Sequence, residues 1–160
     1  AHNLPFDLGM LQKEGFENKF TLIDTLRCAR HLLDNSPYHR LQYLRYSLEL
    51  YKNELEEANK HNITIKAHDA IGDVLVMKLL LSKLVALAKE QFPQNNPMQT
   101  LAQLTKQPIF IKTFKFGKYK GRSIEEICDE DIGYINWFIK SMELDEDMKY
   151  TLDKIMGHVE

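Results

Sequence analysis

The sequence predicts a mainly α-helical protein with a small β component. Apolar residues recur at helical spacing along much of the chain, and the longest such stretch covers residues 69–90. Only two runs, residues 20–23 and 109–116, have the β-branched and aromatic character of strands. Of the 160 residues, 44% are hydrophobic and 28% are charged, and there are only 7 Gly and 5 Pro. This composition excludes disordered, collagen-like and disulfide-scaffold chains.

The cysteines and the apolar runs indicate the cellular compartment of such a protein. Cys28 and Cys128 lie far apart in the sequence and belong to no CxxC or His-rich motif. Such cysteines are typical of reduced, buried positions rather than of a disulfide or a zinc site. No apolar run approaches the roughly 20 residues that a membrane-spanning helix needs. We therefore expect a cytoplasmic protein.

Residues 1–62 are expected to form short helices and one strand. Gly15 should end the first helix, because glycine readily adopts the backbone conformation that follows a helix. Asp24 and Thr25 offer an N-cap for the second helix. The expected elements are, in order, a helix over residues 4–11, a strand over residues 20–23, a helix over residues 25–33, helical spacing over residues 41–51 and a polar surface segment over residues 53–62.

A long helix over residues 69–90 is expected to be buried on most sides. Its apolar stripe includes Val74, Leu84 and Ala88, and further leucines lie beside that stripe. Two prolines and several amides in residues 92–97 break this helix, so we place a domain boundary there. The predicted organisation is a first domain over residues 1–92, a linker with a short helix over residues 93–108 and a small α+β domain over residues 109–160.

The second domain is expected to combine one strand with three helices. Thr100 should cap the short helix that precedes this domain. Ser123 and Glu126 have the spacing of a capping box, which predicts a helix that starts after Ser123. The expected elements are, in order, a strand over residues 109–116, a turn over residues 117–121, the helix capped by Ser123, and helices over residues 132–141 and 145–157.

Charge is segregated along this second domain. Every charged residue from Lys106 to Arg122 is basic, whereas residues 125–147 are dominated by Glu and Asp. Lys118, Lys120 and Arg122 are therefore candidates for binding the phosphates of a nucleic acid, with neighbouring rings able to stack on its bases. The alternative is that these rings form the core of the domain while the lysines only face solvent. The rings in this alternative are Phe114, Phe116 and Trp137, whereas the rings available for stacking also include Tyr119.

Three motifs follow one another in the first domain. They are AHNLPFDLGML at residues 1–11, IDTL at residues 23–26 and HDAIGDVLV at residues 68–76. In this order and spacing they resemble the second and third motifs of the DEDDh (DnaQ-like) family of 3′–5′ exonucleases. The resemblance implies the helical half of an RNase H-like α/β fold. It also implies that Asp7 and Asp73 are metal-binding carboxylates and that His68 is the general base that activates water.

Elementary chemistry agrees with these implied roles. Histidine titrates near neutral pH, which suits a base. The oxygen ligands of the family imply two Mg²⁺ or Mn²⁺ ions. Five residues of helix place two side chains about 140° apart, so His68 can converge with Asp73 only if it precedes the helix. The alternative is that His68 is an ordinary loop residue, that Asp73 is an exposed helical residue, and that His2 and Asn3 form a helix cap.

One motif of the family does not occur in the 160 residues. It is a strand that carries Asp-x-Glu and supplies two of the family's four carboxylates. Because the first residue is Ala1 rather than Met, and because this motif is missing, we expect the chain to be the C-terminal part of a longer exonuclease and to be inactive by itself. The surfaces that the missing strands would cover predict self-association.

Residues 101–156 resemble the small C-terminal domain of exodeoxyribonuclease X-like proteins. The resemblance is carried by the segments QLTKQPIFIKTFKFGKYKGRSIEEI, DIGYINWF and LDEDMKYTL. The two resemblances together imply a 3′–5′ exonuclease that hydrolyses DNA, acting on a single strand or a 3′ end, with a DNA polymerase as a further candidate partner. The alternative is a non-catalytic module that binds nucleic acid or a polymerase.

Overall fold

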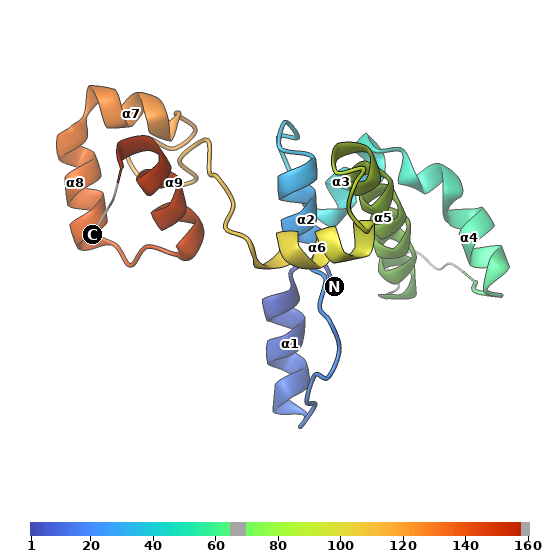
Figure 1. Cartoon of the computed structure of the whole chain (residues 1–160). Coiled ribbons are helices and arrows are strands. Elements are labelled where there is room, and N and C mark those ends of the chain that lie inside the picture. Colours follow the sequence, from blue (N-terminus) through green and yellow to red (C-terminus); the bar gives the residue numbers. More distant parts are fainter. Residues whose placement is uncertain (65–69, 158–160) are drawn as a thin grey trace. The chain divides into compact units, whose positions relative to one another are not determined.

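The computed structural model describes residues 1–64 and 70–157, and it is mainly helical, as predicted (Figure 1). The chain divides into two compact units, Ala1–Gln107 and Pro108–Glu160. Each unit has a hydrophobic core of its own. Within the described ranges, no helix is both long and apolar enough to cross a membrane.

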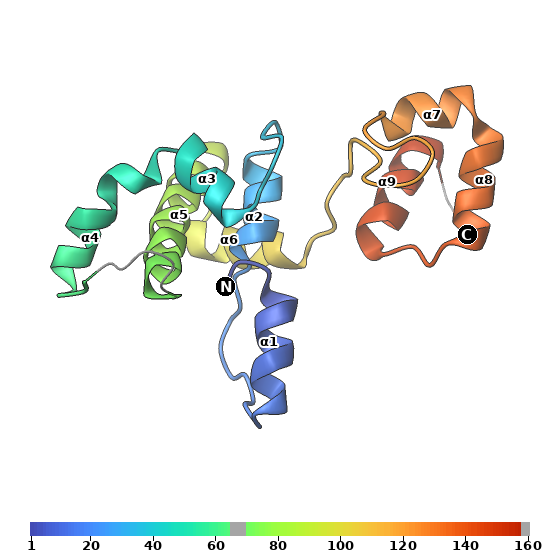
Figure 2. The same ribbon diagram turned by 180° about the vertical axis from the view of Figure 1, so that it is seen from behind.

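The first unit is built around its longest helix. Its elements are α1 (Leu4–Lys13), α2 (Thr25–Leu32), α3 (Leu41–Ser47), the 3-10 helix η1 (Leu50–Asn53), α4 (Glu54–Lys60), α5 (Ala70–Gln91) and α6 (Pro97–Lys106). Helices α2, α3, α4 and α6 all pack against α5, which Figure 2 shows from behind. The core between them includes Cys28, Leu80, Leu84 and Leu101. Cys28 is a free, fully buried thiol, as predicted, and burial raises its pKa.

Helix α6 belongs to this core. Leu101 and Leu104 of α6 are both buried and pack with residues of α2 and α5. The sequence assigned residues 93–108 to a linker with a short helix, and the structure places that helix within the first compact unit. Its cap also differs from the prediction. Asn96 is the N-cap, and its side-chain oxygen accepts hydrogen bonds from the backbone of Met98 and Gln99, whereas Thr100 lies inside the helix.

Helix α5 is less enclosed than its sequence predicted. Its buried residues are Leu75, Val76, Leu80, Leu84 and Ala88. In contrast, Ile71 and Val74 of the first turns are 47% and 56% exposed. The prediction of burial on most sides is therefore wrong for the start of α5. The neighbouring helices cover one face of α5 and leave the opposite face to solvent.

The strand predicted over residues 20–23 does not form. Phe20 is 77% exposed, and no neighbouring strand accompanies it among the residues that the structure describes. A strand needs a partner for its backbone hydrogen bonds. The backbone at the end of this segment is hydrogen-bonded to the first residue of the chain instead. The amino group of Ala1 donates to the carbonyl of Ile23 at 3.3 Å, and the amide of Thr25 donates to the carbonyl of Ala1 at 2.9 Å.

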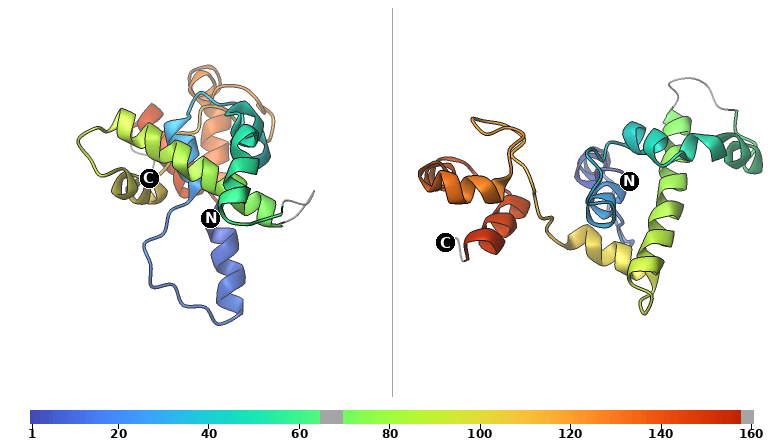
Figure 3. Two further views of the ribbon diagram at one scale, coloured as in Figure 1. Left: turned by 90° about the vertical axis from the view of Figure 1, so that its right-hand side faces the viewer. Right: turned by 90° about the horizontal axis from the view of Figure 1, so that it is seen from above.

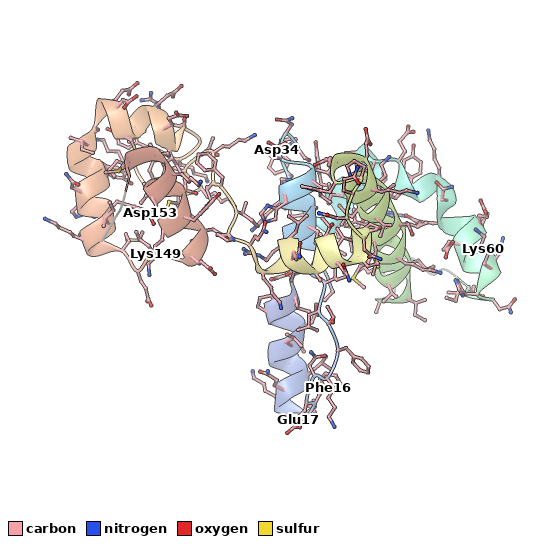
Figure 4. The ribbon with its side chains drawn as sticks, in the orientation of Figure 1. Phe16, Glu17, Asp34, Lys60, Lys149 and Asp153 are labelled. Carbon is pink, nitrogen blue, oxygen red and sulfur yellow. The ribbon has the colours of Figure 1, made fainter. Side chains whose placement is uncertain are left out.

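Helix α1 is the least packed element of the first unit. None of its residues is buried, and Phe6, Met10 and Leu11 are 65%, 57% and 45% exposed. Figure 1 and the left view of Figure 3 show α1 standing away from the other helices of the unit. Figure 4 places Phe16 and Glu17 beyond the far end of α1, on the loop that leads back towards α2. The fixed end of α1 is therefore its N-terminus.

The second unit packs three helices over a non-helical segment. The helices are α7 (Ile124–Glu130), α8 (Ile132–Ser141) and α9 (Glu146–Met156). Its core consists of Phe114, Ile124, Ile127, Cys128, Ile135, Phe138, Met148 and Leu152. As predicted, Ser123 caps α7 by accepting a hydrogen bond from the amide of Glu126 at 3.4 Å. Cys128 is also a free, buried thiol, as predicted.

The strand predicted over residues 109–116 is wrong. The β pairing among the described residues is a single bridge between Thr113 and Ser123. Two backbone amides of the segment donate hydrogen bonds to side chains of α9 instead. The amide of Ile109 donates to Asp147 at 2.9 Å, and the amide of Ile111 donates to the hydroxyl of Thr151 at 2.8 Å. The start of the segment is thus attached to α9, whereas residues 112–114 are joined to residues 121–124 by backbone hydrogen bonds, among them that from the amide of Phe114 to the carbonyl of Arg122 at 3.0 Å.

Candidate functional site

One buried carboxylate joins the first two motifs. Asp24 is 1% exposed and is the N-cap of α2. Its Oδ1 accepts hydrogen bonds from the amides of Leu26 at 2.9 Å and Arg27 at 3.4 Å. The same carboxylate also accepts from the amides of Asn3 at 3.1 Å and Leu4 at 2.8 Å. Asp24 therefore holds the N-termini of both α2 and α1, where negative charge is favourable.

This arrangement corrects the role expected for Asn3. Asn3 precedes α1 in the left-handed conformation, at φ 81°, which asparagine tolerates better than most residues. Its side chain makes no capping hydrogen bond. The cap of α1 comes instead from Asp24, 21 residues further along the chain.

His2 fixes the same region through both ring nitrogens. Its Nε2 lies 2.8 Å from the carbonyl of His39, and its Nδ1 lies 3.0 Å from the hydroxyl of Thr25. Burial lowers the pKa of His2, which favours the neutral ring. A carbonyl can only accept, so Nε2 carries a proton and donates to His39, while Nδ1 lies beside the Thr25 hydroxyl, which itself donates to the carbonyl of Ala1 at 3.0 Å. Both nitrogens are therefore used in holding the start of the chain against α2.

The predicted metal-binding carboxylates lie on two separate helices. Asp7 is half-buried on α1. Asp73 is exposed in the first turn of α5, where it accepts a hydrogen bond from the side-chain amide of Gln42 at 2.9 Å. His68, the predicted base, lies outside the described residues. The first described residue of α5 is Ala70.

The donor type of the two carboxylates fits a hard divalent cation such as Mg²⁺ or Mn²⁺. Their arrangement does not complete a site. Among residues 1–64 and 70–157, no group of three or more His, Cys, Asp or Glu side chains is placed to hold a metal ion. Asp7 and Asp73 can therefore supply only part of a coordination shell.

A shallow pocket that the sequence did not predict lies beside Asp73. Its volume is about 500 Å³. It is lined by Arg40, Leu41, Gln42, Tyr43, Tyr46 and Asp73. The segment HRLQYLRY at residues 39–46 contains several basic and aromatic residues, and this composition could have indicated the site. One positive charge of this segment is already paired, because Arg45 forms a bidentate ion pair with the buried Glu54.

In the second unit, acidic residues neutralise two of the three cations predicted to bind phosphate. The ammonium of Lys118 lies 3.1 Å from the carboxylate of Asp131. The guanidinium of Arg122 lies 3.0 Å from Glu130. Lys120 is exposed and forms no ion pair with any residue that the structure describes. The charges that are segregated along the sequence thus meet in the folded unit.

Asp131 organises the basic turn. Its carboxylate accepts hydrogen bonds from the hydroxyl of Tyr119 at 2.6 Å, the amide of Tyr134 at 2.9 Å and the ammonium of Lys118 at 3.1 Å. These donors, with the Tyr119 hydroxyl foremost, lower the pKa of Asp131 to about 2. Asp131 also caps α8, so it attaches the turn to the start of that helix.

The aromatic rings of this unit divide between core and surface. Phe114 is 2% exposed and belongs to the core, as the alternative interpretation expected. Phe116 and Trp137 are 50% and 54% exposed, so they are not core residues. Two large rings therefore lie at the surface of the unit that carries the basic turn.

Comparisons with known proteins point to one nuclease family. Residues 114–141 match the family model described as Exodeoxyribonuclease X-like C-terminal. Over 157 residues the chain is 26% identical to Exodeoxyribonuclease 10 of Escherichia coli strain K12, and this match covers 95% of the chain and 61% of the relative. The same protein of Escherichia coli O6:H1 gives the same identity and coverage. No solved structure matches the chain significantly.

These comparisons confirm the predicted resemblance to the DnaQ-like exonucleases. The chain spans less than two thirds of the length of the curated relatives that it matches. The family-model match lies within the second unit and covers the basic turn, Asp131 and both exposed rings. The features described above for the second unit are therefore those of the matched segment.

We expect Asp24→Ala to lower the free energy of unfolding of the first unit by about 2–4 kcal/mol, because it leaves the amides of two helix N-termini without their acceptor. Urea unfolding followed by far-UV circular dichroism measures this loss. The fluorescence of Trp137 serves as the internal reference, since it reports on the second unit. Glu17→Ala, on an exposed loop, should change stability by less than about 0.5 kcal/mol. An equally small loss for Asp24→Ala would contradict the anchoring role.

We expect Tyr119→Phe to raise the pKa of Asp131 from about 2 towards 3.8, because it removes the strongest donor to the carboxylate. The ionised carboxylate stabilises the second unit fully above pH 3.8, and this contribution is lost as the pH falls through about 2. NMR titration of the Asp131 carboxyl carbon measures the shift. Tyr150→Phe on α9 is the matched control and should leave this pKa unchanged. An unshifted pKa in Tyr119→Phe would contradict the assignment.

Proposed function

We propose that the chain is part of a 3′–5′ exodeoxyribonuclease. The observation that carries this proposal is the Asp24 anchor, which ties the segment containing Asp7 to the IDTL motif by two hydrogen bonds. The first two of the three motifs that resemble the exonuclease family are thus physically connected in the fold. Similarity to an exodeoxyribonuclease along 95% of the chain supports the same proposal.

The proposed roles follow the chemistry of the side chains. Asp7 and Asp73 supply carboxylate oxygens that suit Mg²⁺ or Mn²⁺. Two such ions, when bound, stabilise negative charge on the attacking and leaving oxygens at the scissile phosphate. His68 accepts the proton of the attacking water, because a neutral imidazole is the abundant form near neutral pH. We propose that the remaining carboxylates, those of the Asp-x-Glu motif, come from a segment outside these 160 residues.

The two parts of the chain have different proposed roles. Residues 1–92 contribute to an RNase H-like exonuclease domain, residues 93–108 connect it to the rest, and residues 109–160 form an accessory domain. We propose that the accessory domain binds DNA through Lys118, Lys120 and Arg122. For Lys118 and Arg122 this requires a phosphate to compete with Asp131 and Glu130.

A second candidate function is a non-catalytic module that binds nucleic acid or a polymerase. The observation that favours it is that the described carboxylates form no three-ligand metal site, whereas the second unit carries exposed rings beside cations. The two candidates differ in one measurable respect. The exonuclease cleaves DNA and needs His68 for this turnover, whereas the binding module has no turnover.

In the full-length protein that carries these residues, we expect His68→Ala to lower turnover about 10²- to 10⁴-fold, because a general base acts on the attacking water in the transition state. Its affinity for Mn²⁺ should stay unchanged. Asp73→Asn should instead weaken Mn²⁺ binding. Single-turnover cleavage of 3′-labelled single-stranded DNA and Mn²⁺ titration separate the two effects. The 160-residue chain alone should release few mononucleotides.

Two outcomes would contradict these assignments. Cleavage at the parental rate by His68→Ala would remove the base assignment, whereas no cleavage by the unaltered full-length protein would favour the binding module. Robust mononucleotide release by the 160-residue chain, with contaminating nuclease excluded, would show that the carboxylates present are sufficient. His61→Ala is the matched control, since His61 lies on the exposed end of α4 and pairs with Glu57. It should leave turnover unchanged.

We also expect the 160-residue chain to self-associate through α1. Phe6 and Met10 lie one helical turn apart and are both more than half exposed, so their apolar surface is available for contact. Sedimentation velocity should detect dimers or larger species. Phe6→Ser with Met10→Lys should raise the dissociation constant at least about tenfold, because burying each such side chain is worth about 1.5–3 kcal/mol. A compact monomer at high concentration would contradict the prediction.

A further inference from the structure

We infer that Phe116 and Trp137 form a stacking platform for the bases of single-stranded nucleic acid, with Lys120 as the adjoining phosphate contact. The inference rests on the proposed function for the nature of the ligand. It goes beyond that function by assigning the mode of binding to two rings and one cation. None of these three residues has a role in the proposed cleavage reaction.

The two exposed rings are the outer members of a continuous aromatic row. Phe116 lies against Phe138 with ring centroids 6.1 Å apart. Phe138 stacks on Tyr134 at 6.2 Å with an interplanar angle of 25°. Tyr134 in turn lies 5.5 Å from Trp137. Phe138 is 2% exposed, whereas the outer two rings are half exposed, so the row connects the core to the surface.

This packing fixes the outer rings before any ligand arrives. Tyr134, Trp137 and Phe138 all belong to α8, a regular helix of ten residues. Phe138 belongs to the core of the unit, and Tyr134 packs against that core. A ring held in this way loses little conformational entropy on binding, which is the main cost of ordering a surface side chain. The outer rings are therefore suited to stacking on flat groups.

A glycine lets the basic turn approach the aromatic row. Gly117 adopts φ +79°, and a Cβ atom there would lie 2.9 Å from the hydroxyl of Tyr134. Any other residue would collide with Tyr134 or push the turn away. Tyr119 packs edge-on against Tyr134 with centroids 4.8 Å apart. The turn that carries Lys118 and Lys120 is consequently held against the rings of α8.

The cations near the aromatic row indicate what kind of ligand fits this surface. Lys118 lies 4.6 Å from the centre of the Tyr119 ring and is paired with Asp131. Lys120, on the same turn, is exposed and forms no ion pair within the described part of the chain. We therefore assign the first phosphate contact to Lys120. A ligand that offers flat rings and anionic groups at short intervals matches this surface, and single-stranded nucleic acid is such a ligand.

The chain carries its own reporter for this contact, because Trp137 is its only tryptophan. The 160-residue chain is titrated in EDTA with an oligothymidylate of about 15 nucleotides, the upper range of a compact single-strand site. We expect quenching of the Trp137 fluorescence. An abasic oligonucleotide of equal length offers the same phosphates without bases, and it should bind without comparable quenching. Equal quenching by both would overturn the stacking assignment.

Variants of the rings test the platform by a second readout. Fluorescence anisotropy of the labelled oligonucleotide should show at least about fivefold weaker binding for Phe116→Ala and for Trp137→Ala, since one base–ring stack contributes about 1–3 kcal/mol. Trp137→Phe keeps a ring and should retain most of the affinity, provided that the fold is intact by circular dichroism. Phe110→Ala, which removes another exposed ring of the same unit, should have no effect.

The cation is tested by salt dependence. Lys120→Gln should weaken binding and reduce the slope of log affinity against log salt concentration by about one. Unchanged binding in all three variants, or no binding of the oligonucleotide at all, would overturn the inference, and the latter would favour a protein partner. Because EDTA removes divalent ions, these results do not depend on His68. Failure of the exonuclease proposal and failure of the platform are therefore distinguishable.

Discussion

The position of α1 depends on the carboxylate of Asp24. A ten-residue helix without one buried side chain cannot be held by its own packing. Its first turn is fixed instead by hydrogen bonds from Asn3 and Leu4 to Asp24. The amide of Asp24 donates to the hydroxyl of Thr105 at 2.9 Å, so the anchor extends to α6. Segments separated by about 80 residues in the chain are thus joined at one point, and Asp7 is carried by the helix that starts there.

What the sequence predicted well are features that depend on neighbours in the chain. The caps of α2 and α7 were predicted because Asp24 and Ser123 act on amides two or three residues ahead. The strands failed for the opposite reason. The segment over residues 20–23 has the composition of a strand, but composition cannot supply the partner that a ladder requires. In the segment over residues 109–116, the amides of Ile109 and Ile111 donate to side chains of α9, and the amide of Phe114 donates to the carbonyl of Arg122.

The same distinction applies to the candidate site. The sequence indicated that the turn after Phe116 is basic, but it could not show that Asp131 and Glu130 neutralise Lys118 and Arg122. Those pairs form only when α7 and α8 fold back onto the turn. The exposure of the rings was no more predictable. Residues two apart in an extended strand share a face, yet Phe114 is 2% exposed and Phe116 is 50% exposed. The chain bends from residue 115 onwards, so the alternation of a strand does not continue to Phe116.

The two units differ in how firmly the surrounding structure holds their candidate residues. In the first unit Asp7 lies on a helix with no buried residue and Asp73 lies in an exposed first turn, so neither carboxylate is enclosed by the described structure. In the second unit Trp137 stands on a helix whose inner face is core and Phe116 packs against Phe138 of that helix, and the cations lie on a turn that Asp131 ties to the same helix. The proposed binding surface of the second unit would therefore need no further group to complete it, whereas the proposed metal site of the first unit would need further ligands. Affinity for a single strand should therefore be retained under conditions that abolish cleavage, because the two activities depend on different residues with different degrees of support.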